Sequence, residues 1–298
     1  MQPPKQIDLR AAAILTLCCL IWGVGMVMIK FANAGISPVV NAALRSIMAC
    51  SILFLFAAWR GVKLFERDGT LWIGLCCGIV FAIEFIGLYT GLTLTTASRG
   101  TLFMHAAPFV AAAGEHFLVP GHRLSGIRLL GLTAAFLGLA LALGEGLMAH
   151  NAPSSTGDLL CLLGGIGWGT GTVLVKTSKL RTAPPEKTML YQLGFSAPVL
   201  LAWAWFIGEA GITALTPAVI VAFLYTVLLV VVFGYTIWFW MMRTYSAASL
   251  HAFTFLSPIF GAIAGHVILG EHLGTWTIGA LGLVAVGIYL VNRPTPSR

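Results

Sequence analysis

The chain consists of long apolar stretches separated by short polar breaks. Ten stretches have about 20 mostly apolar residues, the length that a helix needs to cross the hydrocarbon layer of a membrane. They lie at 11–32, 38–59, 71–93, 99–119 and 125–145 in the first half and at 158–177, 187–207, 217–240, 248–269 and 275–292 in the second half. The pattern predicts an all-α integral membrane protein with ten transmembrane helices.

The composition supports this class and excludes a soluble enzyme. Of the 298 residues, 58% are hydrophobic and 9% are charged, whereas about 25% of the residues of a soluble domain are charged. The net charge of +7 does not indicate nucleic-acid binding, because the basic residues are spread over several loops. The six cysteines fall inside predicted helices without metal-ligand spacing, so we expect neither a metal nor a cofactor.

The basic residues predict the orientation in the membrane. With a cytoplasmic N-terminus, most of the 17 lysines and arginines fall on the cytoplasmic side. These are Lys5, Arg10, Arg60, Lys63, Arg67, Arg123, Arg128, Lys176, Lys179, Arg181, Lys187, Arg243, Arg293 and Arg298. Lys30 and Arg99 fall on the opposite side, and Arg45 lies within a helix. Since loops rich in lysine and arginine stay inside, both termini are predicted to be cytoplasmic.

An internal repeat divides the chain into two copies, residues 1–149 and 150–298. Residues 21–30 (IWGVGMVMIK) match residues 167–176 (GWGTGTVLVK) at an offset of 146. The pairs that keep this offset, or an offset of 150 further on, include Trp22/Trp168, Lys30/Lys176, Pro38/Pro184 and Pro108/Pro258. Each copy has five predicted crossings, and an odd number makes the two copies inverted in the membrane. Inverted repeats are typical of secondary transporters that work by alternating access around a site near the midplane.

Several motifs resemble those of one family. They are Ile21-Trp22-Gly23, Pro38 followed by Arg45, Ala97-Ser98 leading to Pro108 with its repeat Ala248-Ser249 to Pro258, and Leu269-Gly270-Glu271-His272-Leu273. In this order, and duplicated, they resemble the EamA family of the drug/metabolite transporter superfamily over essentially the full length. The resemblance implies ten helices in a bacterial inner membrane and export of amino acids or related small metabolites. One departure is Gly121 at the position that matches Glu271, so we expect Glu271 to be a loop or capping residue.

Charged residues at membrane depth are costly and therefore candidate functional groups. Arg45 lies about two turns into the second predicted helix, with Asn41 one turn before it on the same face. Its forked donors suit a substrate carboxylate, but it could instead tie helices together through backbone carbonyls or Glu84. The repeat aligns Tyr191 with Arg45, and Gln192 follows it. This pair could supply hydrogen bonds from the second copy.

Glu84 is the deepest acid in the chain and aligns with Gly234 in the second copy. A carboxyl group at that depth suits proton-coupled exchange or binding of a substrate ammonium. The equally weighted alternative is a neutral, hydrogen-bonded glutamic acid. We predict roles for Glu84 in coupling and in substrate binding.

Aromatic residues are the candidate walls of a binding site. By resemblance to family members that export aromatic compounds, Trp22 and Trp168 are expected near the central cavity. Further candidates are Tyr89, His105, Tyr235 and Trp238. Packing in the core or against lipid is the alternative for each of them. It suits Trp59, Trp72, Trp203 and Trp276 better, because these lie near helix ends.

Pro108 and Pro258 are predicted inside the fourth and ninth helices, where a missing backbone hydrogen bond kinks the helix and creates a hinge. The predicted partners are a small-molecule substrate, the lipid bilayer and, in the coupled alternative, protons. The oligomeric state is open, and a monomer is compatible with the sequence.

The function predicted for the whole chain is a secondary transporter of amino acids or related metabolites. Export of drugs or other hydrophobic compounds is the alternative. A membrane-embedded lipid-modifying enzyme is disfavoured, because the sequence has no His-Glu-x-x-His motif and no Gly-x-Ser-x-Gly elbow.

Overall fold

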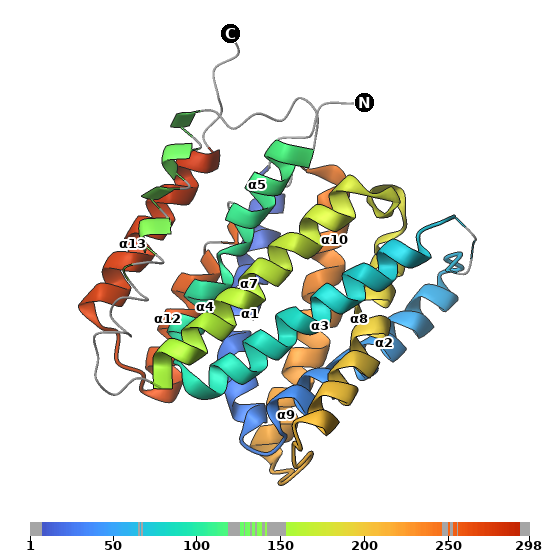
Figure 1. Cartoon of the computed structure of the whole chain (residues 1–298), viewed down its shortest axis with the longest axis horizontal. Helices are drawn as coiled ribbons and strands as arrows, with labels where there is room; N and C mark the ends of the chain where they lie inside the picture. The colour runs from blue at the N-terminus through green and yellow to red at the C-terminus, as the bar shows by residue number, and fades with distance from the viewer. Residues whose placement is uncertain are drawn as a thin grey trace.

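A computed structural model describes residues 8–64, 66, 68–118, isolated residues between 126 and 141, and residues 153–245, 250, 253–254 and 256–292. Its elements are helices (Figure 1). They are α1 (Leu9–Asn33), α2 (Pro38–Trp59), α3 (Leu71–Leu94), α4 (Ala97–Met104), α5 (Ala107–Leu118), α7 (Pro153–Thr177), the 3-10 turn η1 (Lys179–Thr182), α8 (Pro185–Phe206), α9 (Pro217–Tyr225), the π-helix η2 (Thr226–Tyr235), α10 (Thr236–Thr244), α12 (Leu256–Leu269) and α13 (Thr275–Asn292).

Six helical segments are long and apolar enough to cross a membrane. They are Leu9–Asn33, Pro38–Trp59, Leu71–Leu94, Ser155–Thr177, Pro185–Phe206 and Pro217–Met241, and shorter apolar helices include Leu256–Leu269. The prediction of an all-helical, multi-pass membrane protein is therefore confirmed. About half of the predicted helix at 125–145 lies outside the described residues, and so does most of the start of the one at 248–269. The count of ten therefore remains a prediction.

The prediction that 99–119 is one helix with Pro108 in its interior is wrong. α4 ends at Met104 and α5 begins at Ala107. Between them the backbone N–H groups of His105 and Ala106 donate to carbonyl oxygens only three residues back, at 3.1 Å each. Pro108 lies in the first turn of α5, where its missing N–H leaves no hydrogen bond unmade.

Pro258 differs from its prediction in the same way. It lies in the first turn of α12, directly after Ser257, whose N–H donates to the carbonyl oxygen of Thr254 at 3.0 Å. Pro108 therefore follows a break in the helix, and Pro258 lies at the start of a helix, while most of residues 246–255 lie outside the described part of the chain.

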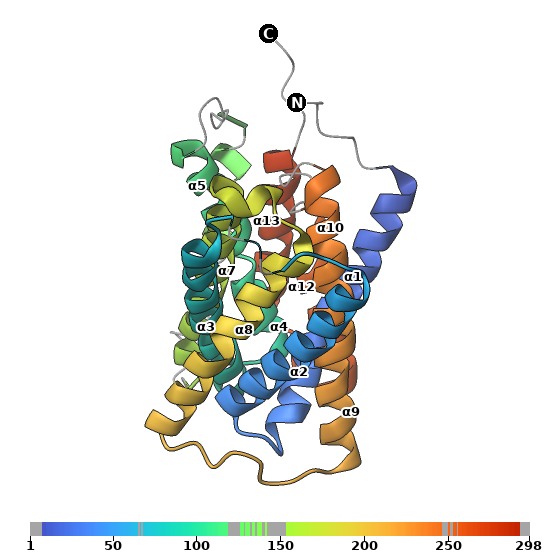
Figure 2. The ribbon, with the colours of Figure 1, turned by 90° about the vertical axis from the view of Figure 1, so that its right-hand side faces the viewer.

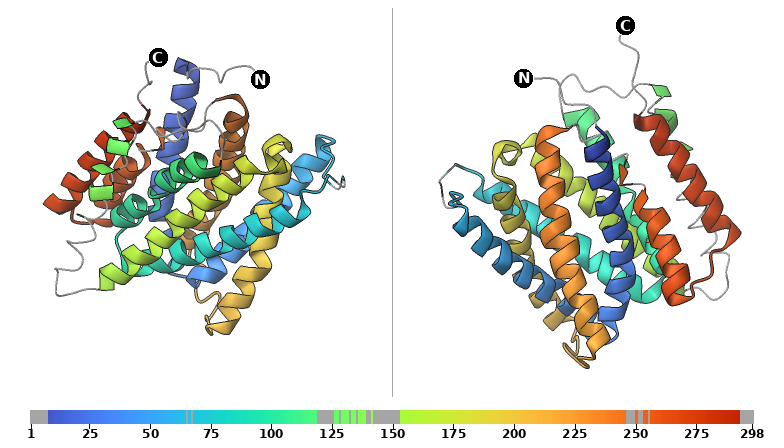
Figure 3. Two further views of the ribbon diagram at one scale, coloured as in Figure 1. Left: turned by 45° about the horizontal axis from the view of Figure 1, so that its top comes forward. Right: turned by 180° about the vertical axis from the view of Figure 1, so that it is seen from behind.

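The two copies predicted from the repeat interleave in the core. α3 packs against α7, α2 against α8, and α1 against α12, α9 and η2 (Figures 1 and 3). Glycines allow the closest crossing. A Cβ at Gly167 would lie 3.0 Å from the Cβ of Glu84, and one at Gly87 would lie 2.5 Å from the carbonyl oxygen of Leu160. Small residues let helix backbones approach closely in this way, so α3 and α7 form a tight wall.

Both ends of the described chain lie at one end of the molecule, where α1 begins and α13 ends (Figures 1 and 2). We call this the Leu9 end and the opposite one the Asn33 end. At the Asn33 end an isolated bridge between Ile36 and Ile212 joins the α1–α2 turn to the α8–α9 loop. The close contact requires Gly35, because a Cβ there would lie 2.0 Å from the carbonyl oxygen of Ala214.

Glu271 caps α4 at the Asn33 end, as predicted for a loop or capping residue. Its Oε1 accepts the N–H of Ala97 at 2.7 Å, and its Oε2 accepts the N–H of Ser98 at 3.2 Å. Lys30 Nζ lies 3.2 Å from Oε1 of the same carboxylate. One acidic side chain thus joins the turn after α12 to the end of α1 and the start of α4.

Two ion pairs join the connection between α2 and α3 to the start of α8, toward the Leu9 end. Arg60 Nη1 lies 3.3 Å from Glu186 Oε1, and Lys187 Nζ lies 2.8 Å from Asp68 Oδ2. The hydrogen bond from the Lys187 ammonium, with a second one from Thr70, holds the pKa of the Asp68 carboxyl well below its usual range. These contacts fix the loop before α3 against the start of α8.

Candidate functional site

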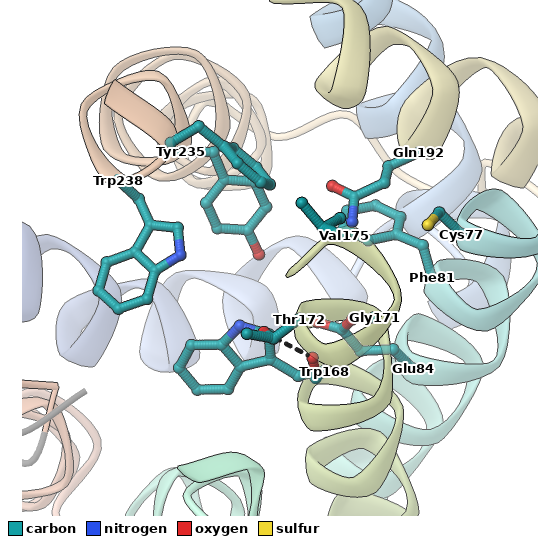
Figure 4. A pocket seen from close by; sticks show the side chains of 11 residues that line it. Cys77, Phe81, Glu84, Trp168, Gly171, Thr172, Val175, Gln192, Tyr235 and Trp238 are labelled. Carbon is teal, nitrogen blue, oxygen red and sulfur yellow. Dashed lines mark hydrogen bonds between the residues drawn. The ribbon is translucent and has the colours of Figure 1, made fainter. Parts of the chain in front are cut away.

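Two cavities adjoin in the middle of the helix bundle. The Gln192 cavity is lined by Cys77, Phe81, Glu84, Trp168, Gly171, Thr172, Val175, Gln192, Tyr235, Trp238 and Phe239 (Figure 4). The Arg45 cavity is lined by Trp22, Gly25, Met26, Ile29, Arg45, Glu84, Phe85, Leu88, Met104, His105, Trp168, Val230, Tyr235 and Ser257. Glu84, Trp168 and Tyr235 belong to both walls and therefore separate one cavity from the other.

The cavities extend from these three residues toward opposite ends of the molecule. On α3 the Gln192 cavity reaches back to Cys77, toward the Leu9 end, whereas the Arg45 cavity reaches forward to Leu88. Val175 follows Trp168 by about 10 Å along α7, at 1.5 Å per residue. In the Arg45 cavity, Ile29 lies the same distance after Trp22 along α1, and since α1 ends at Asn33, Ile29 lies toward the Asn33 end. Glu84, Trp168 and Tyr235 therefore lie between the two cavities.

Four aromatic side chains from three segments meet at this boundary. The ring centroid of Trp22 lies 5.5 Å from that of Trp238, 6.1 Å from that of Tyr235 and 6.5 Å from that of Trp168. The rings meet edge to face, the arrangement that their quadrupoles favour. His105 stands perpendicular to Trp168 with centroids 5.8 Å apart. The sequence-predicted Trp22, Trp168, Tyr235, Trp238 and His105 are thus brought together.

Arg45 reaches the cavity from α2 and is 1% exposed. Its guanidinium carbon lies 3.8 Å above the centroid of the Phe85 ring and 5.3 Å from that of Tyr89. Glu84 is 4% exposed and lines both cavities. The only acid and the only arginine that described residues contribute to these walls therefore lie in one chamber.

Three predicted binding residues lie outside both linings. The Asn41 amide donates to Asn33 Oδ1 at 2.8 Å, so it ties α2 to α1. Tyr191 packs against the start of α3, with its hydroxyl 3.1 Å from Thr70 Oγ1. Tyr89 lies behind Arg45, with its ring 5.9 Å from Phe85. Gln192, the neighbour of Tyr191, does line a cavity.

Sequence reasoning missed several wall residues that the repeat could have identified. Positions three, four and seven after Trp22 are Gly25, Met26 and Ile29, and all line the Arg45 cavity. The matching positions after Trp168 are Gly171, Thr172 and Val175, and all line the Gln192 cavity. The repeat offset of 146 combined with helical spacing thus predicts three wall residues in each cavity.

The tryptophans assigned to lipid are exposed, as expected. Trp59, Trp72, Trp203 and Trp276 are 81%, 77%, 42% and 52% exposed in the absence of a bilayer. Exposed tryptophans near helix ends are typical of a lipid-facing position.

Apolar spanning helices around an internal chamber define a membrane transporter. The chain belongs to the EamA-like transporter family, whose model matches residues 9–144 and 155–293. It is therefore a multi-pass membrane transporter and not an enzyme.

The chain is similar to transporters over nearly its full length. It is 28% identical to an uncharacterized transporter of Archaeoglobus fulgidus, covering 94% of this chain and 96% of the relative. It is 25% identical to a probable amino-acid metabolite efflux pump of Salmonella typhimurium, covering 92% of each chain. A solved structure described as the crystal structure of a protein has the same fold, with a TM-score of 0.70, 16% identity, and coverage of 95% of this chain and 97% of the other.

Proposed function

We propose that the protein is a secondary transporter that exports small metabolites, amino acids or related compounds, across the bacterial plasma membrane by alternating access. The observation that carries this proposal is the boundary formed by Glu84, Trp168 and Tyr235, which belong to two cavities directed toward opposite ends. A site reached from both sides is what alternating access requires.

The proposed orientation has both termini in the cytoplasm, with residues 1–149 and 150–298 as inverted copies. The Gln192 cavity then opens toward the cytoplasm, and the Arg45 cavity opens toward the outside. Substrate enters the former, contacts Trp168 and Tyr235, and leaves through the latter. The helix break before Pro108 is one proposed hinge, because few intrahelical hydrogen bonds oppose bending there, and the start of α12 at Pro258 is the other.

Glu84 is the proposed coupling residue, since its position in both walls lets it exchange a proton or an ammonium with either side. Trp22, Trp168, His105, Gln192, Tyr235 and Trp238 are proposed to contact substrate. Asn41, Tyr89 and Tyr191 are now proposed to support the walls from behind.

Amino-acid export is supported by the names of two similar proteins, the probable amino-acid metabolite efflux pumps of Salmonella typhimurium and Escherichia coli. The mostly apolar lining of the Arg45 cavity favours the alternative, export of hydrophobic compounds.

Counterflow separates the two proposals. Purified protein in liposomes preloaded with one unlabelled amino acid should accumulate the same labelled amino acid and saturate with concentration. Counterflow of hydrophobic cations with none for any of the twenty amino acids would overturn the amino-acid proposal. Absence of counterflow for both classes would overturn the exchange of solutes by this carrier.

A further inference from the structure

Arg45 carries a buried charge that forms no ion pair with a carboxylate of the described residues. Among the described residues that line the two cavities it is the only lysine or arginine. Its Nε and Nη2 find no hydrogen-bond acceptor in the described part of the chain. No carboxylate described by the structure lies within 4.0 Å of it either. Leaving such a group unpaired is costly, so an arrangement of this kind favours a ligand that completes it.

The two unpaired atoms are neighbours on one edge of the guanidinium. Nε–H and Nη2–H point in the same direction, and this edge can hold both oxygens of a carboxylate at once. The Phe85 ring lies against the flat face of the group at 3.8 Å. With that face covered, the free edge is the part that remains to bind a solute.

Arg99 shows what this edge does when it is occupied. It is the other buried arginine of the described chain, and its Nε lies 3.2 Å from each oxygen of Asp158. Its Nη2 bonds to the same carboxylate. In Arg45 the same pair of donors has no such partner among the described residues, and Arg45 is a residue of the cavity wall.

We infer that the Nε–Nη2 edge of Arg45 is an anion subsite that holds the carboxylate of the transported compound. The inference rests on the proposed transport function and adds to it the charge of the substrate. Because Glu84 lines the same cavity without pairing to Arg45, the two residues select a zwitterion: the carboxylate meets Arg45, and the ammonium meets Glu84. Arg45 lines only the Arg45 cavity, so the carboxylate contact forms beyond the shared boundary.

Three probes of one size test this subsite. They are L-phenylalanine, its amide, which replaces the carboxylate by a neutral group, and 3-phenylpropanoate, which lacks the ammonium. Binding to purified protein is measured by ligand-dependent thermal stabilisation. Wild type should bind L-phenylalanine about tenfold more tightly than the amide, the effect expected for hydrogen bonds to a charged group. Arg45→Gln should remove this preference and leave the affinity for the amide within about twofold.

Two further variants keep the test decisive. Arg45→Lys retains the charge but lacks the paired guanidinium donors, so it should keep only part of the preference for the acid over the amide. This variant replaces Arg45→Gln in the test if Arg45→Gln does not fold. Arg60→Gln removes an arginine from the end of the same helix, outside both cavities, and should preserve the wild-type pattern. An undiminished preference for the acid in folded Arg45→Gln, or an equal loss for all three probes, would overturn the subsite.

The result is distinguishable from failure of the proposed function. Saturable counterflow, together with an undiminished preference of Arg45→Gln for L-phenylalanine over its amide, would overturn the subsite but not the proposed function. No binding of any probe to wild type would also overturn it, and counterflow of the full amino-acid panel would then decide the proposed function by itself.

Discussion

The indole of Trp22 lies where a side chain at position 234 would have to project. A Cβ added to Gly234 would come within 2.7 Å of Trp22 Nε1, which donates to the carbonyl oxygen of Val230 at 3.4 Å. Gly234 is the residue that the repeat aligns with Glu84. The second copy therefore has no room for an acid at this position, and Glu84 is the only glutamate among the described residues that line the chamber.

Gly234→Ala should destabilise the protein by about 1–3 kcal/mol, the usual cost of overpacking. Gly282→Ala is the matched control, because a Cβ at Gly282 meets nothing within 4 Å. The control should be neutral or slightly stabilising, since alanine favours a helix. Thermal unfolding in detergent compares the two. Equal transition temperatures for both variants would show that Trp22 moves aside freely.

Glu84→Gln should abolish export while the protein remains folded. The substitution keeps the shape of the side chain but removes both its charge and its exchangeable proton. Export is measured in liposomes with an imposed proton gradient, and folding is measured by thermal unfolding. Glu186→Gln is the matched control, because Glu186 is also buried but lies outside both cavities. Unchanged transport of every substrate by Glu84→Gln would remove its coupling role.

Glu271→Gln should cost more stability than Lys30→Met. The first change weakens the cap of α4 as well as the ion pair, whereas the second leaves the two N–H contacts of Glu271 in place. A loss of about 1–3 kcal/mol is expected for Glu271→Gln, since hydrogen bonds to charged groups are the strong ones. Lys30 Nζ also donates to the carbonyl oxygen of Thr95 at 2.8 Å, and the reverse order in thermal unfolding would show that Lys30 contributes chiefly through this hydrogen bond.

The difference in stability between wild type and the Asp68→Asn variant should become smaller as the pH falls. The hydrogen bond from Lys187 lowers the pKa of Asp68 in the folded protein below its unfolded value, which is about 3.9. The carboxylate therefore contributes stability above about pH 4, and this contribution is lost as the pH falls through the folded pKa. Thermal unfolding between about pH 3 and pH 7 checks the trend. A difference that is constant across this range would contradict it.

The helical membrane fold was predictable because apolar length alone identifies spanning segments. The internal breaks were not. The run through His105 is continuously apolar, so only backbone hydrogen bonds reveal where α4 ends and α5 begins. The π-helix at Thr226–Tyr235 was not predictable for a related reason. A segment that is apolar on all sides has no hydrophobic periodicity that would distinguish a π-helix from an α-helix.

The candidate site was predicted in part. Arg45 and Glu84 were recognisable as charges at membrane depth, and both line the chamber. Asn41 shares a helix face with Arg45, yet one turn earlier that face meets Asn33 at the end of the bundle. Tyr191 and Gln192 differ by about 100° around α8, and no sequence pattern indicates which of them faces inward.

Cys76 and Cys77 are consecutive on α3 and face different surroundings. Cys76 is exposed on the outside of the bundle, whereas Cys77 is buried and lines the Gln192 cavity. The protein thus has two native thiol reporters, one for the membrane and one for the interior pathway. A lipid-soluble maleimide should label the first whichever side the transporter faces. A charged thiol reagent should label the second only while water fills the cavity, so the rate of its reaction should rise with the fraction of time that this side is open.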